Sequence, residues 1–172
     1  GTTRLLREPS RAVDLASAVN PVSGLNVLAT GGALALRKAD ATALSITGFQ
    51  GVTGDTTITG AGAVTITGNA LVADGTLFTR GAGTLAVGGG GVLRGLGTVD
   101  VSATGLPLQV EGTIAPGTVA TTGTLAIAGG VAFGATGRLD VRLRSAASHD
   151  RLAVNGAATL DGTLNVALDG GF

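Results

Sequence analysis

Residues 123–130 read GTLAIAGG and residues 137–143 read GRLDVRL, and each run places two aliphatic residues two positions apart next to glycine. Side chains two apart in a β-strand point to the same face, so each run presents one apolar stripe. The residue between the two aliphatics, Ala126 or Asp140, points to the opposite face. These runs predict short strands that are buried on one side only.

The same unit recurs along the chain. The aliphatic pairs are Leu44/Ile46, Val64/Ile66, Leu85/Val87, Val99/Val101, Leu125/Ile127, Leu139/Val141, Leu152/Val154 and Leu164/Val166. Turn residues separate the units, and repetition of this kind predicts a solenoid in which each coil buries its stripe against its neighbours. The dipeptides Asp74-Gly75, Asn155-Gly156, Asp161-Gly162 and Asp169-Gly170 are also hairpin signals. An antiparallel β-sandwich therefore stays open as an alternative, above all after Asp150, and a hairpin near the C-terminal end would fit both folds.

The composition of the 172 residues excludes several classes of protein. Hydrophobic residues make up 44% and charged residues 13%, the reverse of a disordered chain. There is no cysteine and one histidine, which excludes a disulfide scaffold and the usual zinc sites. The net charge is zero and aromatics are 2%, so we expect no nucleic-acid binding. An interior of Val, Ile, Leu and Ala suits the narrow core of a solenoid.

Two segments allow more than one structural interpretation. Residues 3–19 form either a short helix capped by Ser10 or further strands. Residues 117–137 carry no charge, yet their alternating pattern predicts strands and turns rather than a membrane span. The first residues contain no apolar core of a signal peptide, so we expect any such peptide to lie outside this chain.

Residues 93–168 resemble the passenger-associated transport repeat of bacterial autotransporters, the proteins of type V secretion. The resemblance lies in a series of runs in fixed order: LRGLGTV (93–99), EGTIAPG (111–117), GTLAIAGG (123–130), GRLDVRL (137–143), HDRLAVNG (149–156) and ATLDGTLNVAL (158–168). One departure is TVATTGTL after Pro116-Gly117, where relatives often have a turn with Ser or Asn. The remaining half of the chain fits the same architecture without a diagnostic motif.

This resemblance implies a right-handed parallel β-helix over residues 1–172, a single passenger segment. It implies secretion through the periplasm and outer membrane to the cell surface, by an outer-membrane β-barrel translocator of the same polypeptide. That barrel would lie outside this chain, because four Phe cannot supply its aromatic girdles. The chain ends inside the pattern, at LNVALDGGF, so we expect the protein to continue.

The acidic residues give little sign of catalysis. His149-Asp150 is the only His-acid neighbour pair, no Gly-x-Ser-x-Gly motif accompanies it, and in the repeat Asp150 stands at a structural turn. No two acids lie within two positions of each other, although stacking of coils can unite distant ones. The eleven acids are Glu8, Asp14, Asp40, Asp55, Asp74, Asp100, Glu111, Asp140, Asp150, Asp161 and Asp169. We predict no catalytic, cofactor-binding or metal-binding residue and no enzymatic activity.

Three further features have a structural and a functional interpretation. Asp140 lies among Arg138, Arg142 and Arg144, which predicts solvated ion pairs between coils, with a polyanion-binding patch as the alternative. Gly88–Gly91 is predicted to be a mobile turn, because neither a Lys-Ser/Thr nor a helix follows to make a phosphate loop. The pairs Ser45/Thr47, Thr57/Thr59 and Thr65/Thr67 are predicted to face solvent, since their unequal spacing spoils a regular ice-binding array.

Three functions follow from these observations. The first is a structural stem whose stacked aliphatics promote folding and outward secretion, carried by Ile114, Leu125, Ile127, Leu139, Val141, Leu152 and Val154. The second is an adhesin surface that binds host cells, a host protein or sister molecules. The third, least favoured, is a polysaccharide-active enzyme.

Overall fold

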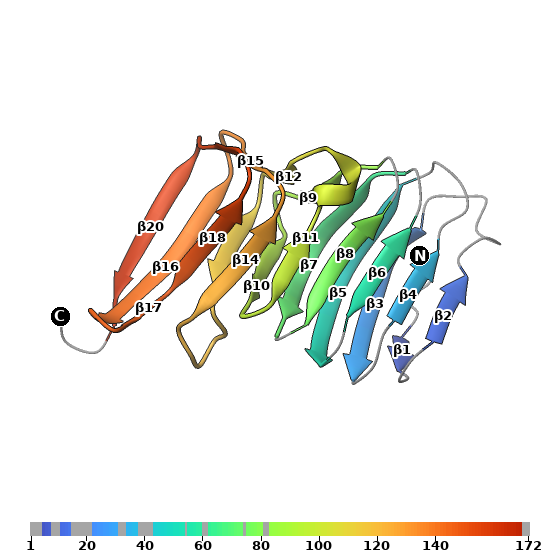
Figure 1. The fold of residues 1–172 in the computed structure, drawn as a ribbon, viewed down its shortest axis with the longest axis horizontal. Coiled ribbons are helices and arrows are strands. Elements are labelled where there is room, and N and C mark those ends of the chain that lie inside the picture. Colours follow the sequence, from blue (N-terminus) through green and yellow to red (C-terminus); the bar gives the residue numbers. More distant parts are fainter. Residues whose placement is uncertain are drawn as a thin grey trace.

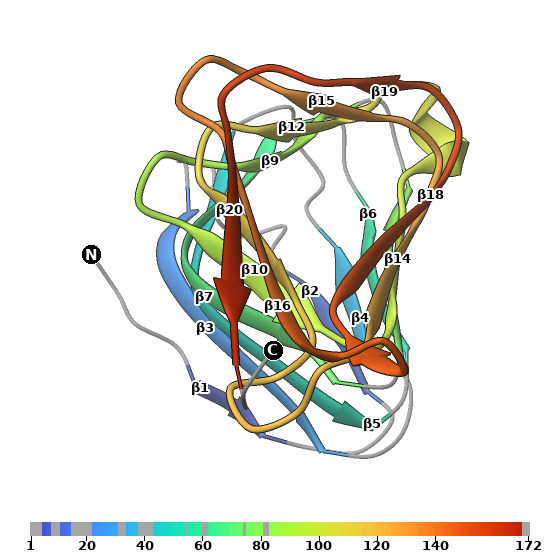
Figure 2. The same ribbon diagram turned by 90° about the vertical axis from the view of Figure 1, so that its left-hand side faces the viewer.

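The computed structural model describes residues 5–7, 11–14, 22–30, 34–37, 43–53, 55–59, 62–73, 75–80 and 83–169. In these residues the chain winds into a right-handed parallel β-helix. In Figure 1 the strands of the near side run upward and those of the far side run downward while the coils advance from right to left. Figure 2, which looks along the axis, shows three faces around a central core. The predicted β-helix is confirmed.

Face 1 is a seven-stranded parallel sheet with one strand from each coil. Its strands are β2 (Arg11–Asp14), β4 (Leu34–Arg37), β6 (Thr56–Thr59), β8 (Thr76–Arg80), β11 (Thr98–Asp100), β14 (Thr124–Ala128) and β18 (Arg151–Asn155). The register places like residues beside each other, as with Leu36 and Ile58 or Ile127 and Val154. The alternation read from the sequence therefore builds one continuous apolar row along the axis.

Faces 2 and 3 belong to one continuous sheet, because the early strands bend through the corner between them. The long strands β3 (Val22–Thr30), β5 (Leu44–Thr53) and β7 (Val64–Val72) contribute to both faces, and β1 (Leu5–Arg7) pairs with β3. Later coils divide this path into two strands. Face 2 continues as β9 (Leu85–Val87), β12 (Leu108–Val110), β15 (Val131–Phe133) and β19 (Ala158–Thr159), and face 3 as β10 (Val92–Gly95), β13 (Thr113–Pro116), β16 (Arg138–Ser145) and β20 (Thr163–Leu168). A 3-10 helix, η1 (Ser102–Thr104), joins faces 1 and 2 in one coil.

All eight predicted aliphatic pairs lie in the stack, and their burial falls toward its C-terminal end. Pairs from Leu44/Ile46 to Leu125/Ile127 are buried at 7% exposure or less. Leu139, Leu152 and Val154 are partly buried and pack against that core. Leu164 and Val166 on β20 are 64% and 47% exposed, because no described coil covers them. The prediction of a one-sided apolar stripe is confirmed, and the exposure of each pair reflects its position in the stack.

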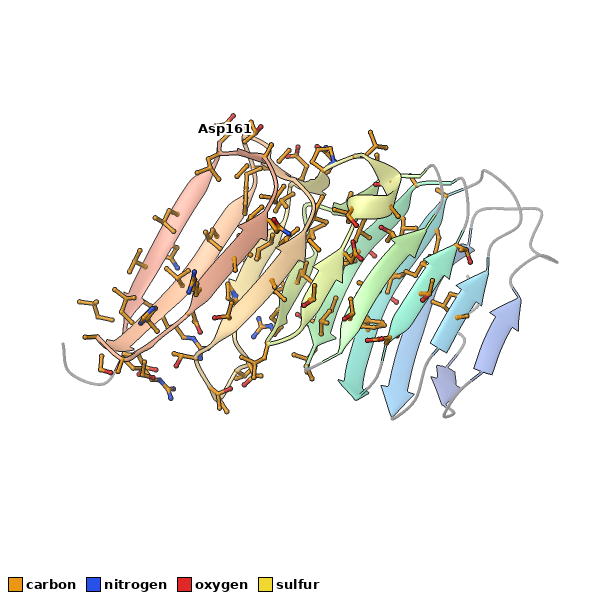
Figure 3. The ribbon with its side chains drawn as sticks, in the orientation of Figure 1. Asp161 is labelled. Atoms are coloured by element: carbon orange, nitrogen blue, oxygen red, sulfur yellow. The ribbon has the colours of Figure 1, made fainter. Side chains whose placement is uncertain are left out.

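The turn dipeptides Asn155-Gly156 and Asp161-Gly162 form corners between consecutive strands of the coils, whereas Asp74 and Gly170 of the other two lie outside the described residues. Gly162 has φ +79°, a conformation that glycine adopts at little cost, and its amide donates to the Asp161 carboxylate at 2.7 Å. Figure 3 shows Asp161 at the upper rim, between β19 and β20. The antiparallel sandwich is contradicted, because strands after Asp150 pair in parallel with the preceding coil. The Gly162 corner uses the positive φ that a hairpin turn also uses, so this dipeptide alone does not distinguish the two.

One hairpin does occur, but before Asp150. β16 pairs antiparallel with β17 (Ser148–His149), with Leu143 opposite His149. The expectation of a hairpin near the C-terminal end is therefore confirmed. At the N-terminal end, residues 11–14 form β2, which favours the strand alternative there. The rest of the helix candidate, residues 15–19 included, lies outside the described residues. No helix in the described ranges is long and apolar enough to cross a membrane.

Burial predicts a position-dependent cost of truncating the same side chain. Leu125 is fully buried and Leu164 is 64% exposed, although both point inward from their strands. We expect Leu125→Ala to lower the free energy of unfolding by about 2–5 kcal/mol. Leu164→Ala should cost less than about 1 kcal/mol because it removes little buried area. Urea unfolding followed by circular dichroism measures both, and equal costs would contradict the described burial.

Candidate functional site

Among the described residues, Asp150 is the only buried one that carries a charge, and 1% of its side chain is exposed. It follows β17 directly and turns inward beneath the corner between faces 3 and 1. Oδ2 accepts from the Arg142 amide at 3.0 Å and from Arg142 Nε at 2.8 Å. Oδ1 accepts from the Gly123 amide at 3.0 Å and from Arg142 Nη2 at 3.3 Å. The buried charge is thus paired and hydrogen-bonded, as burial requires.

The guanidinium of Arg142 also holds a neighbouring loop, residues 117–123. Nη1 donates to the Val119 carbonyl at 3.1 Å, and Nη2 donates to the carbonyls of Thr118 at 2.7 Å and Thr121 at 2.8 Å. Carbonyls in such a loop have no strand partner, so one side chain satisfies three of them. Thr118 also holds the loop from within, because its hydroxyl accepts from the amides of Ala120 at 3.2 Å and Thr121 at 3.0 Å.

The ion pair of Arg142 and Asp150 connects a loop and a hairpin that project from successive coils at the same corner. The loop 117–123 leaves the corner between β13 and β14, and the hairpin β16–β17 leaves it one coil later. Thr122 and Ser148 join them with a hydroxyl hydrogen bond of 2.9 Å. A Cβ on Gly117, which has φ +84°, would lie 2.5 Å from Asp150 Oδ1 and 2.8 Å from Arg142 Nη2. The close packing therefore requires glycine at this position.

The other two arginines of the trio pair differently from the prediction. Arg138 pairs with Asp140 two residues on in the same strand, and Arg144 pairs with Asp169 of the next coil at 2.8 Å. Only Arg144 makes the solvated pair between coils that the sequence predicted. Arg142 is partly buried instead, because its guanidinium reaches under the loop. Each of the three arginines has a carboxylate partner, so a polyanion at this patch would compete with these ion pairs.

The structure separates His149 from the acid beside it. His149 is exposed on β17, whereas the Asp150 carboxylate points inward to Arg142 and Gly123. The contacts give Asp150 a structural role. Elsewhere in the described residues, no three His, Asp or Glu side chains gather as a metal site would need. Asp140 and Asp150 line one cavity, yet each is bound by an arginine.

The glycine run and the threonine pairs belong to the solenoid itself. Gly88–Gly91 forms the turn between β9 and β10, where the Gly91 amide donates to the Gly88 carbonyl at 2.7 Å. Thr59 donates to the Leu36 carbonyl at 3.3 Å, Thr67 donates to the Ile46 carbonyl at 3.3 Å, and Ser45 bonds Thr67 at 3.2 Å. These hydroxyls link coils rather than forming a free ordered array.

A cavity of about 250 Å³ opens on the outer surface of face 3 beside the loop. Its lining includes Arg94, Ala115, Asp140, Arg142, Asn165 and Ala167. Sequence reasoning did not single out Arg94, which lies alone between apolar residues in LRGLG. Only the stacking of β10, β13, β16 and β20 brings it near the other polar residues. Arg94 could have been identified from the sequence by aligning the outward-facing positions of successive coils.

The buried pair predicts strong coupling between Arg142 and Asp150. We expect Arg142→Gln and Asp150→Asn each to lower the free energy of unfolding by about 3 kcal/mol, since each leaves a charge underneath the loop without its partner. In a double-mutant cycle, the two changes should couple by about 1–3 kcal/mol. Arg144→Gln and Asp169→Asn are the matched control, because that pair is exposed and worth less than about 1 kcal/mol. Equal coupling energies in the two cycles would contradict a greater contribution of the buried ion pair to stability.

Neither a protein-family model, nor a curated protein, nor a solved structure matches the chain. The relation to autotransporter passengers therefore rests on the motifs between residues 93 and 168 and stays a prediction. The described residues establish a parallel β-helix with one buried ion pair and one polar cavity on its outer surface.

Proposed function

We propose that the chain is a structural segment of a surface-exposed autotransporter passenger, a stacked β-helical stem that promotes folding and outward translocation. The observation that carries the proposal is the uninterrupted apolar core, which runs from Leu36 to Phe133 with exposures of 7% or less. Each coil covers the one before it and offers its own stripe to the next. A chain that emerges gradually through a membrane can be drawn outward by such stacking, because each added coil buries further apolar area.

The C-terminal coils are suited to fold first in this scheme. Asp150 bonds Arg142 only eight residues away, so the loop that this contact closes is short. Short loops lose little entropy on closure and form quickly. The loop 117–123, the hairpin and strand β14 can thus assemble into a template on which preceding coils stack. The absence of cysteine favours passage of an unfolded chain.

The stem role requires no enzymatic activity, and the environment of the acids supports this part of the proposal. Asp140 and Asp150, which share the cavity, are both bound by arginine and lie among alanines and valines. A polysaccharide-active enzyme would need a carboxylate free to donate or accept a proton.

A surface-display experiment tests the template. The chain is expressed between a signal peptide and an outer-membrane β-barrel translocator, and display is measured by antibody labelling of intact cells and by protease resistance. Leu125→Asp, in the expected template, should abolish display of folded protein, because it buries a charge at a site that is 0% exposed. Val141→Asp, at a partly buried position, should reduce display less.

Leu36→Asp is the matched control, because Leu36 is also 0% exposed but lies in an early coil. It should leave the C-terminal coils displayed and protease-resistant. Normal display of Leu125→Asp would refute the stem proposal, and equal loss in Leu125→Asp and Leu36→Asp would refute the C-terminal template.

An adhesin or self-associating surface is the second candidate, and one observation favours it. Leu164, Val166 and Leu168 form an apolar row on β20, the last strand that the structure describes, with exposures of 64%, 47% and 66%. Exposed apolar side chains of this kind can pack against another chain. Sedimentation of the purified chain should then reveal dimers that Val166→Lys dissociates. A monomer that also fails to bind host cells would exclude this candidate.

A further inference from the structure

The cavity on face 3 has a structural origin in the outward positions of four stacked strands. The pair Leu71/Arg94 joins β7 to β10, and the pairs Arg94/Ala115 and Asp140/Asn165 extend the same outward row through β13, β16 and β20. Neighbouring strands lie about 4.8 Å apart, so these side chains stand next to one another. Ala115 is short, which leaves a hollow between the arginine and the polar pair.

The loop held by Arg142 forms one wall of this hollow. Thr118 and Val119 line the cavity from the loop, and Val119 is 80% exposed at its tip. Ala167 on β20 lines it on the side of the last coil. The cavity therefore combines methyl groups from Ala115, Val119 and Ala167 with polar groups from Arg94, Asp140 and Asn165.

The charges around the cavity leave one guanidinium without a counter-charge. Arg142 is neutralised by Asp150, and Asp140 is neutralised by Arg138. Arg94 is half-buried, and across the described ranges it forms no ion pair or hydrogen bond. The site therefore has one unbalanced positive charge, carried by a group with five donors in a fork that fits a carboxylate.

We propose that this cavity binds a small monoanionic sugar acid, with its carboxylate on Arg94. A charge of minus one balances the site. The Asn165 amide and the second carboxylate oxygen of Asp140, Oδ2, are placed to bind ring hydroxyls, since the bond from Arg138 goes to Oδ1. The three methyl-bearing residues contact the C–H surface of the ring. A volume of about 250 Å³ admits one sugar unit, being below the range of sites for larger ligands.

Binding at this site is independent of the stem role, because it uses outward side chains that the core does not need. A stem that displays normally could lack the site, and a failed stem role would leave the cavity unchanged. The two proposals therefore fail separately.

The test is titration of the whole purified chain, followed by backbone-amide NMR, with glucuronate, glucose and acetate as probes. Glucuronate should bind saturably and shift the amides of β10, β13 and β16. Glucose, which lacks the carboxylate, and acetate, which lacks the ring, should each bind about tenfold more weakly or worse. No saturable binding of glucuronate would overturn the proposal, and so would glucose or acetate binding as tightly as glucuronate.

Variants locate the site. Arg94→Gln should weaken glucuronate binding about tenfold or more while the amide spectrum stays that of the folded chain. Arg94→Lys, which keeps the charge but loses the fork, should lie between Arg94→Gln and the unaltered chain. Arg144→Gln is the matched control, because Arg144 is an exposed arginine on the same strand face outside the cavity lining. Affinity unchanged by Arg94→Gln, or lowered equally by Arg144→Gln, would overturn the assignment to this cavity.

Discussion

The structure depends on in-register stacking of aliphatic side chains from one coil to the next. No coil has a core of its own: the inward pair of each strand is covered only by the pairs above and below it, as Leu125 and Ile127 are covered by Val99 on one side and by Leu152 and Val154 on the other. The backbone ladder fixes this register, and the absence of large side chains keeps the interior narrow. Burial then decreases toward β20, where the stack has no further described neighbour.

Polar groups join this apolar framework at one corner. The buried carboxylate of Asp150 would be costly alone, and Arg142 with two backbone amides offsets that cost. The same guanidinium binds three loop carbonyls, so one arginine fixes the wall of the cavity on face 3. Loop 117–123 is also where the sequence departs from the repeat that it resembles. Its conformation is held both by Thr118 within the loop and by Arg142 of the next coil.

Much of the fold could be predicted because the relevant signals are local. The alternation in SITG or TLAIA determines which face of a strand is apolar, and the predicted pairs from Leu44/Ile46 to Leu125/Ile127 are buried in the core. The place of the hairpin could not be predicted, because the Asp161-Gly162 corner uses a positive-φ glycine just as a hairpin turn does. The cavity could not be predicted from the sequence either. Arg94 and Asn165 are brought together by a register that skips unequal numbers of residues, and the pairing of Arg142 with Asp150 depends on a loop between them in space.

The coils differ in length, and this difference shows where the chain can accept insertions and deletions. Leu36 lies beside Ile58, 22 residues on, whereas Val99 lies beside Ile127, 28 residues on, yet both strand pairs keep perfect alternation. The additional residues are accommodated by η1 and the loop 117–123, outside the sheets. Corner length is thus uncoupled from core register, so peptides can be inserted or deleted there while the stacked rows stay in place. The corner that η1 occupies, unlike the loop held by Arg142, offers a site for grafting foreign segments onto an otherwise constant rod.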